Sequence, residues 1–377
     1  MTDTAIHAPA APVHARPVPL FSRRYTLELR QQMAVPTQAL ILALAIVAGL
    51  AISAAILVAA GVPAHELLNE FVMQTLVDRQ SLQAVLFQAA PMILVGIGAA
   101  LAFRARFWNL GLEGQMIFGA IGATAVSMFD VGPPALRLPL MGAVAVAMGM
   151  AWALIPALLK LRLAVNEIIA SLMLNYVAGN VLLHLVYGAW KDPKDSFPYS
   201  PQFRAFERLP EWLGNPGTAA IGLAVLAALL ATWFTGLSRA GLYLRFVDAN
   251  PRVARALGVP VGRMVLTAVL LSGALSGLAG FVVVTGQEGR LTQAFYVGYG
   301  FSGVLIAFLA RNNPLAASVV AVLIAMLFVA GRNLQVFYQI PFAMVQLIQA
   351  ILVICVASSD FFIRHRLRRV SRGAMEG

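Results

Sequence analysis

Residues 37–61, TQALILALAIVAGLAISAAILVAAG, form a run without a single charged side chain. A helix needs roughly 20 mostly apolar residues to cross the bilayer's hydrocarbon core, which is about 30 Å thick. The run therefore predicts a transmembrane helix. The whole chain shares this character, because 60% of its 377 residues are hydrophobic and 11% are charged, whereas about 25% are charged in a typical soluble domain. The sequence predicts an integral membrane protein of the all-α class.

Ten segments of this kind predict a polytopic fold with about ten transmembrane helices. They cover residues 37–61, 84–103, 111–129, 139–159, 167–187, 217–235, 264–286, 297–310, 314–331 and 341–359. The short segment 297–310 is either a span of its own or one arm of a broken hairpin with 314–331.

Lysine and arginine residues are concentrated in alternate connections between these segments. With the N-terminus in the cytoplasm, the cytoplasmic pieces carry 19 of the 27 lysines and arginines. These pieces are 1–36, 104–110, 160–166, 236–263, 311–313 and 360–377. Short cytoplasmic loops of membrane proteins carry such an excess, so both termini are expected in the cytoplasm. The same bias explains the net charge of +11, and no nucleic-acid partner is expected.

The predicted organisation is a transmembrane domain, residues 36–360, between two basic cytoplasmic tails. The tail 1–35 is expected to be flexible, and the tail 361–377 to contact anionic membrane lipids. The domain contains an external loop, 188–216, whose prolines and aromatic residues indicate an ordered cap, and a long cytoplasmic loop, 236–263. The one cysteine excludes an intrachain disulfide, and the five scattered histidines predict no metal site.

The cytoplasmic loop 236–263 predicts a short helix of its own. Asn250 is a suitable N-cap, and Pro251 suits the first helical position. Gly258 can end the helix in the left-handed conformation. The helix is either a connector held at the lipid headgroups by its arginines, or a docking helix whose small residues let a partner approach. In the second interpretation the coupling residues are Asn250, Pro251, Arg252, Ala254, Arg255 and Gly258.

Two carboxylates, Glu113 and Glu167, lie inside predicted spans, where ionisable groups are costly without a partner. Glu167, Ser171 and Asn175 share one helix face, which either bonds to neighbouring helices or forms a polar wall along a substrate path. Glu113 is near the start of a helix that Asn109 could cap. It is either a structural cap or part of a discontinuous helix beside the path. The candidate substrate-path residues are Glu113, Gln115, Glu167, Ser171 and Asn175.

Four stretches together resemble one family. They are NLGLEGQMIFGAIGA (109–123), VNEIIASLMLNYVA (165–178), Asn250 with Ala254 and Gly258-Val259, and GYGFSGVLIAFLARNNP (298–314). Their order resembles that of ABC-transporter permeases of the branched-chain amino acid/ribose/nucleoside importer type, with the nucleoside importers most similar. Arg255 stands where the family usually has the second alanine of a pair.

The resemblance implies a permease subunit of an ABC importer for nucleosides in a bacterial inner (plasma) membrane, and not an enzyme. Its implied partners are a cytoplasmic ABC ATPase, a second related permease as a hetero-dimer, and an extracytoplasmic solute-binding protein. The sequence lacks a Gly-x-x-x-x-Gly-Lys-Ser/Thr loop. We therefore expect no cofactor on this chain, and ATP to be used by the partner subunits. The alternatives are a sugar or branched-chain amino acid permease of the same fold, or a stand-alone secondary transporter.

Overall fold

The computed structural model describes residues 25–29, 33–65, 78–211, 216–296 and 298–369. The chain divides into two compact units. One consists of residues 54–350, and the other of the two end segments, 1–53 and 351–377. Most of the expected tail 1–35, and residues 370–377 of the second tail, lie outside the described residues.

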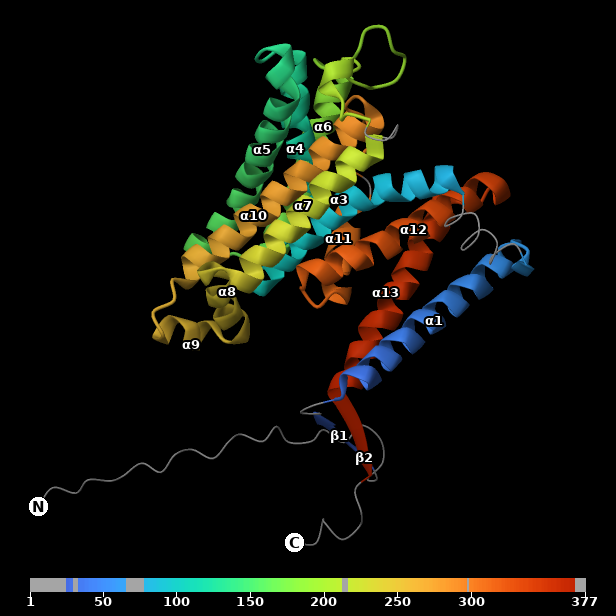
Figure 1. Ribbon diagram of the computed structural model, residues 1–377, viewed down its shortest axis with the longest axis vertical. Helices are drawn as coiled ribbons and strands as arrows, with labels where there is room; N and C mark the ends of the chain where they lie inside the picture. The colour runs from blue at the N-terminus through green and yellow to red at the C-terminus, as the bar shows by residue number, and fades with distance from the viewer. Residues whose placement is uncertain (1–24, 30–32, 66–77, 212–215, 297, 370–377) are drawn as a thin grey trace, which may run out of the picture. The chain divides into compact units, whose positions relative to one another are not determined.

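The unit 54–350 is built from helices (Figure 1). Two short turns, η2 (Ala205–Glu207) and the π-helical η3 (Val283–Glu288), join them. The helices are α3 (Arg79–Arg104), α4 (Leu112–Met128), α5 (Pro134–Leu163), α6 (Glu167–Tyr187), α7 (Pro216–Leu237), α8 (Arg239–Ala249), α9 (Pro251–Ala256), α10 (Val261–Val282), α11 (Tyr299–Leu309) and α12 (Pro314–Tyr338).

All ten segments predicted as spans lie on helices, which confirms the helical membrane fold. Eight helices of the described residues are long and apolar enough to cross a membrane. The other two, α4 and α11, have 17 and 11 residues. Helix α11 is about 16 Å long at 1.5 Å per residue, too short to cross a core of about 30 Å by itself. The count of ten crossings therefore stays a prediction.

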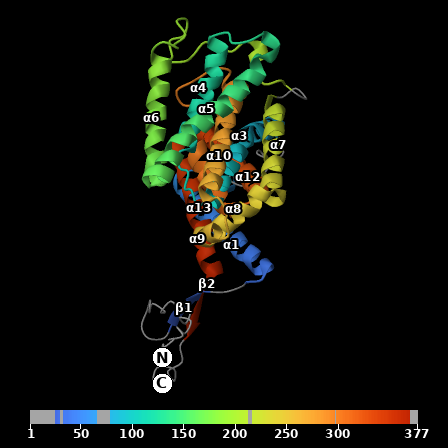
Figure 2. The same cartoon turned by 90° about the vertical axis from the view of Figure 1, so that its left-hand side faces the viewer.

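Helix α3 forms the centre of this unit, and every residue from Gln88 to Phe103 is buried. Helix α10 packs against α3, α4 and α5. A Cβ atom on Gly277 would overlap the carbonyl oxygen of Ala145 and lie 3.1 Å from Gly149 Cα. The small residues of α10 thus allow close helix packing, as small residues do at membrane helix interfaces. Figure 2 shows α6 and α7 at opposite edges of this unit.

Connections predicted on the same side of the membrane contact one another. On the predicted cytoplasmic side, Arg104 Nε donates to the carbonyl of Asn312 at 2.7 Å, and Lys160 Nζ to that of Arg106 at 2.9 Å. On the predicted external side, Arg290 Nη1 lies 2.7 Å from Asp195 Oδ2. These contacts agree with the predicted alternation of loops. Which side faces the cytoplasm stays a prediction.

The end unit contains most of α1 (Val35–Ala59) and the C-terminal part of α13 (Phe342–Arg364). A Cβ atom on Gly49 would lie 2.9 Å from Leu352 Cδ2, so the two helices are in close contact there. Strand β1 (Tyr25–Leu29) pairs antiparallel with β2 (His365–Arg369). Both strands lie in the stretches expected to be tails, and the pairing joins the two ends of the chain.

Candidate functional site

Asn109 and Gln115 are both fully buried and bond to each other. Asn109 Nδ2 donates to Gln115 Oε1 at 3.1 Å, and Gln115 Nε2 donates to Asn109 Oδ1 at 2.9 Å. Asn109 Nδ2 also donates to Ser272 Oγ of α10 at 2.9 Å. Asn109 was expected to cap α4, but the N-cap is Gly111, whose own N–H donates to Asn109 Oδ1. The asparagine instead ties α4 to α10.

Ser171 and Asn175, on one face of α6, bond to the backbone around the start of α4. Ser171 Oγ accepts from the N–H of Leu110 at 3.2 Å. Asn175 Oδ1 accepts from the N–H of Gly114 at 2.8 Å, and its Nδ2 donates to the Leu110 carbonyl at 2.7 Å. The two side chains thus satisfy backbone groups around the N-terminus of α4. We call Asn109, Gln115, Ser171, Asn175 and Ser272 the polar junction.

Glu113 lies at the N-terminus of α11. The backbone N–H groups of Gly298, Phe301 and Gly300 lie near its carboxylate. A Cβ atom on Gly300 would overlap Glu113 Cγ. Free N–H groups and the helix dipole favour an anion at a helix N-terminus. Glu113 therefore caps a neighbouring helix, and two short helices, α4 and α11, start beside each other.

Glu167 is held in an ion pair at the predicted cytoplasmic end of α6. Lys160 Nζ, in the last turn of α5, lies 2.5 Å from Glu167 Oε1. The side chains are 27% and 14% exposed, so the charge of Glu167 is compensated inside the chain. All five candidate path residues consequently make contacts within this chain.

The opposite, outward face of α6 carries polar groups that sequence reasoning left out of the candidate site. Tyr176 is the tenth of 21 residues in the helix and is 64% exposed. Its hydroxyl makes no hydrogen bond within the described part of the chain. Asn180 and His184 follow at helical spacing and are exposed too. A groove of about 440 Å³ is lined by Tyr176, Val177, Asn180, Val181, His184 and Leu185.

The loop 236–263, which is predicted to be cytoplasmic, contains the predicted short helix, α9. Asn250 Oδ1 accepts from the N–H groups of Arg252 and Val253 at 2.9 and 3.3 Å, and Pro251 is the first helical residue. Gly258 follows with φ +79°, the left-handed conformation expected after the helix.

Only part of α9 is available to a partner. Ala254 is fully buried and packs with Val247 and Val259, so its small size serves this internal contact. The side chains of Arg252 and Arg255 are exposed. So are Val253 and Leu257, at 53% and 65%.

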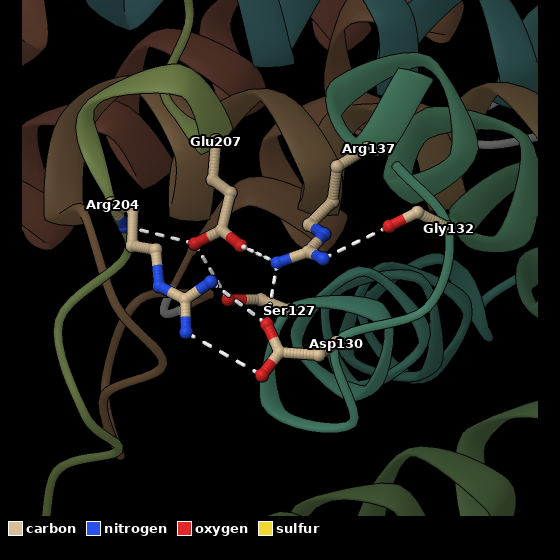
Figure 3. A network of polar contacts seen from close by, with 6 residues as sticks. All are labelled: Ser127, Asp130, Gly132, Arg137, Arg204 and Glu207. Atoms are coloured by element: carbon tan, nitrogen blue, oxygen red, sulfur yellow. Dashed lines mark hydrogen bonds and ion pairs between the residues drawn. The ribbon is translucent and has the colours of Figure 1, made fainter. Parts of the chain in front are cut away.

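The predicted external loop is anchored by a network of two arginines and two carboxylates (Figure 3). Arg137 Nη1 of α5 lies 3.1 Å from Glu207 Oε1 and 2.5 Å from Asp130 Oδ1. Ser127 Oγ donates to Glu207 Oε2 at 2.9 Å. Hydrogen bonds from Arg204 and then Arg137 hold the pKa of the Asp130 carboxyl below its usual range. The network fixes η2 to the turn between α4 and α5, as expected for an ordered cap.

Comparisons with known proteins agree on one family. Residues 81–357 match the family described as branched-chain amino acid transport system / permease component. The chain is 35% identical over 322 residues to the glucose ABC transporter permease protein TsgB13 of Haloferax volcanii, covering 82% of this chain and 85% of that protein.

Two further relatives are named for nucleosides. The guanosine ABC transporter permease protein NupP of Bacillus subtilis is 31% identical, over 72% of this chain and 79% of that protein. The nucleoside ABC transporter permease protein NupB of Lactococcus lactis is 24% identical, over 69% and 74%. The chain therefore belongs to the branched-chain amino acid transport system permease family: it is a multi-pass permease subunit of an ABC transporter of the plasma membrane, a transport protein and not an enzyme.

Proposed function

We propose that this permease imports nucleosides, and that the outward face of α6 lines their path. The observation that carries the proposal is the stripe of Tyr176, Asn180 and His184 near the middle and outer part of a membrane helix. Polar groups exposed at this depth are costly in lipid. They are stable where they line a water-filled path or meet another protein.

The chemistry of the stripe suits a nucleoside. The rings of Tyr176 and His184 offer flat faces on which a base can stack. Asn180 offers an amide oxygen, while its Nδ2 donates to the Tyr176 carbonyl at 2.8 Å. In this proposal the outward face of α6 is held in position from behind by the candidate path residues Glu113, Gln115, Glu167, Ser171 and Asn175.

Partner ATPases use ATP to supply the energy for import, and α9 transmits their movement to this permease. Asn250 and Pro251 start this helix, and Gly258 ends it. Arg252 and Arg255 can pair with acidic groups of the ATPase, and Val253 and Leu257 add exposed apolar surface. Figures 1 and 2 place α8 and α9 at one end of α10, opposite the loop that follows α6.

A second permease completes the path in this proposal. One face of α6 bonds to the start of α4, and the other face is exposed. The opposite side of the substrate path therefore has to come from another subunit. A related but different permease, forming a hetero-dimer, and a solute-binding protein delivering substrate to the external loop 188–216 are the proposed partners.

A sugar is the second candidate substrate, favoured by the 35% identity to a protein named for glucose. Sugars and nucleosides both need hydrogen-bond partners, but the flat base of a nucleoside can also stack on an aromatic ring with its whole face. Loss of the Tyr176 ring should therefore weaken nucleoside uptake more than sugar uptake.

Uptake in a strain lacking this gene tests the proposal. The strain is complemented with the wild type, Tyr176→Phe or Tyr176→Leu, and supplied with a labelled nucleoside or labelled glucose. We expect nucleoside uptake to return with the wild type, to persist with Tyr176→Phe, and to fall roughly tenfold with Tyr176→Leu, the loss of about one stacking contact. Phe337→Leu, which changes a ring that is 63% exposed on α12, is the matched control. Restoration of glucose uptake alone would refute nucleoside import.

A further inference from the structure

Arg106 caps the C-terminal end of α8. Its Nε donates to the carbonyl of Asp248 at 2.8 Å, and its Nη2 to that of Ala249 at 3.1 Å. These are the last two carbonyls of the helix, immediately before the N-cap Asn250 of α9. A cation is favoured at this end, where carbonyls lack helical partners and the dipole is negative. One side chain from the turn between α3 and α4 thus holds the junction of α8 and α9.

The backbone of Arg106 is held from the other side. Lys160 Nζ donates to the Arg106 carbonyl at 2.9 Å and also pairs with Glu167 at the start of α6. Arg106 itself has φ +54°, a left-handed conformation that is uncommon outside glycine, asparagine and aspartate. The backbone turn at Arg106 is therefore held from two sides. Its guanidinium bonds to α8, and its carbonyl bonds to Lys160, which pairs with Glu167 of α6.

The neighbours of Arg106 are packed into a core. Ala105 and Phe107 are buried in a cluster with Leu244 of α8 and Val265 of α10. Such apolar contacts resist separation, but they are not directional and allow sliding. The two charge-assisted hydrogen bonds of Arg106 fix the register between α8 and the turn.

The contacts continue from Arg106 to the starts of α4 and α11. Three residues on, Asn109 enters the polar junction with Gln115 and Ser272. Asn175 of α6 bonds to the Gly114 N–H of α4, and Glu113 of the same turn caps α11. A displacement of α8 and α9 thus reaches the helix carrying Tyr176 through the hydrogen bonds of Arg106, the backbone of residues 106–109 and the hydrogen bonds of the polar junction.

We propose that Arg106 is a positioning residue that transmits movement of α8 and α9 to α4 and α6. The inference rests on the proposed role of α9 in coupling. Without the guanidinium, α9 still engages the ATPase, but its movement is taken up by sliding within the apolar cluster that contains Phe107 and Leu244. ATP hydrolysis then continues while the substrate path fails to switch.

The test uses the complete complex with its ATPase, second permease and binding protein, reconstituted in liposomes. Labelled nucleoside transported and phosphate released are measured together. Arg106→Asn removes the guanidinium but tolerates the left-handed backbone. We expect it to lower the nucleoside transported per ATP about tenfold, the factor that such hydrogen bonds are worth, and Arg106→Lys to restore part of the ratio. Arg263→Gln, which removes an exposed charge near the start of α10, should leave it unchanged.

Three results would overturn the inference. One is that Arg106→Asn transports as much nucleoside per ATP hydrolysed as the wild type. Another is an equal fall in transport and hydrolysis that Arg106→Lys does not relieve, as a purely structural role predicts. The third is an equal loss of ratio in Arg263→Gln. If the wild-type complex itself shows no ATP-driven nucleoside transport, the proposed function fails instead.

Discussion

The side-chain amides of Asn109 and Gln115 bond to each other in both directions, at 3.1 and 2.9 Å, in a fully buried site. Each amide satisfies a donor and an acceptor that would otherwise be unpaired in an apolar surrounding, where an unmade hydrogen bond is costly. The pair accounts for the glutamine that follows Glu113 and Gly114 near the start of α4. Its first role is structural.

Replacing Gln115 with leucine should therefore destabilise the fold. It removes two hydrogen bonds, although Asn109 keeps its bonds to Ser272 and Gly111. An unsatisfied buried group costs about 1–3 kcal/mol, and membrane proteins fall toward the lower end. The thermal unfolding midpoint in detergent should fall for Gln115→Leu but not for Gln346→Leu, a change at an exposed glutamine. Equal midpoints would show that the pair contributes nothing.

Adding one methyl group at Gly300 should displace Glu113. The Cβ atom would overlap Glu113 Cγ and lie 2.9 Å from its backbone nitrogen. We expect Gly300→Ala to lower uptake strongly, since the carboxylate leaves the N-terminus of α11. Gly236→Ala is the control, because a Cβ atom there meets nothing within 4 Å. If the two alanine variants transport equally well, the cap is not needed for transport.

Acid should weaken the network of Arg137, Arg204, Asp130 and Glu207 on the predicted external side. The pKa of Asp130 is lowered, first by its hydrogen bond from Arg204. A carboxyl whose pKa is lower in the folded chain than in the unfolded chain stabilises the fold. This contribution is complete above the pKa of the unfolded chain, about 3.9, and it is lost as the pH falls through the lower pKa of the folded chain. The thermal midpoint of the wild type should thus drop more than that of Asp130→Asn between about pH 7 and about pH 3. If the thermal midpoints of the two proteins fall equally with pH, Asp130 does not cause the loss of stability in acid.

The spans could be predicted because a helix that crosses the membrane needs a continuous run of about 20 mostly apolar residues, which is visible in the sequence. Helix α3 is an example, since residues 84–103 contain no charge and nearly all are buried. The cap and first residue of α9 were also predictable, because the Asn250 side chain bonds to backbone groups two and three residues away and the ring of Pro251 fixes its own backbone angle. Such local signals do not depend on which helices become neighbours.

The contacts of α6 could not be predicted in the same way. The spacing of Ser171 and Asn175 puts them on one face, but it does not say that this face meets the start of α4. Tyr176 lies off that stripe, and its 64% exposure depends on where α5 and α4 stop covering the helix. Ala254 likewise looks available in the sequence, and only the packing of Val247 and Val259 buries it.

Nucleoside import itself is most directly tested by transport into proteoliposomes that contain this permease with its ATPase, second permease and loaded binding protein. We expect ATP-dependent, saturable uptake of a labelled nucleoside that other unlabelled nucleosides inhibit and glucose does not. Uptake that glucose abolishes and nucleosides leave unchanged would contradict the proposal and assign the permease to sugars.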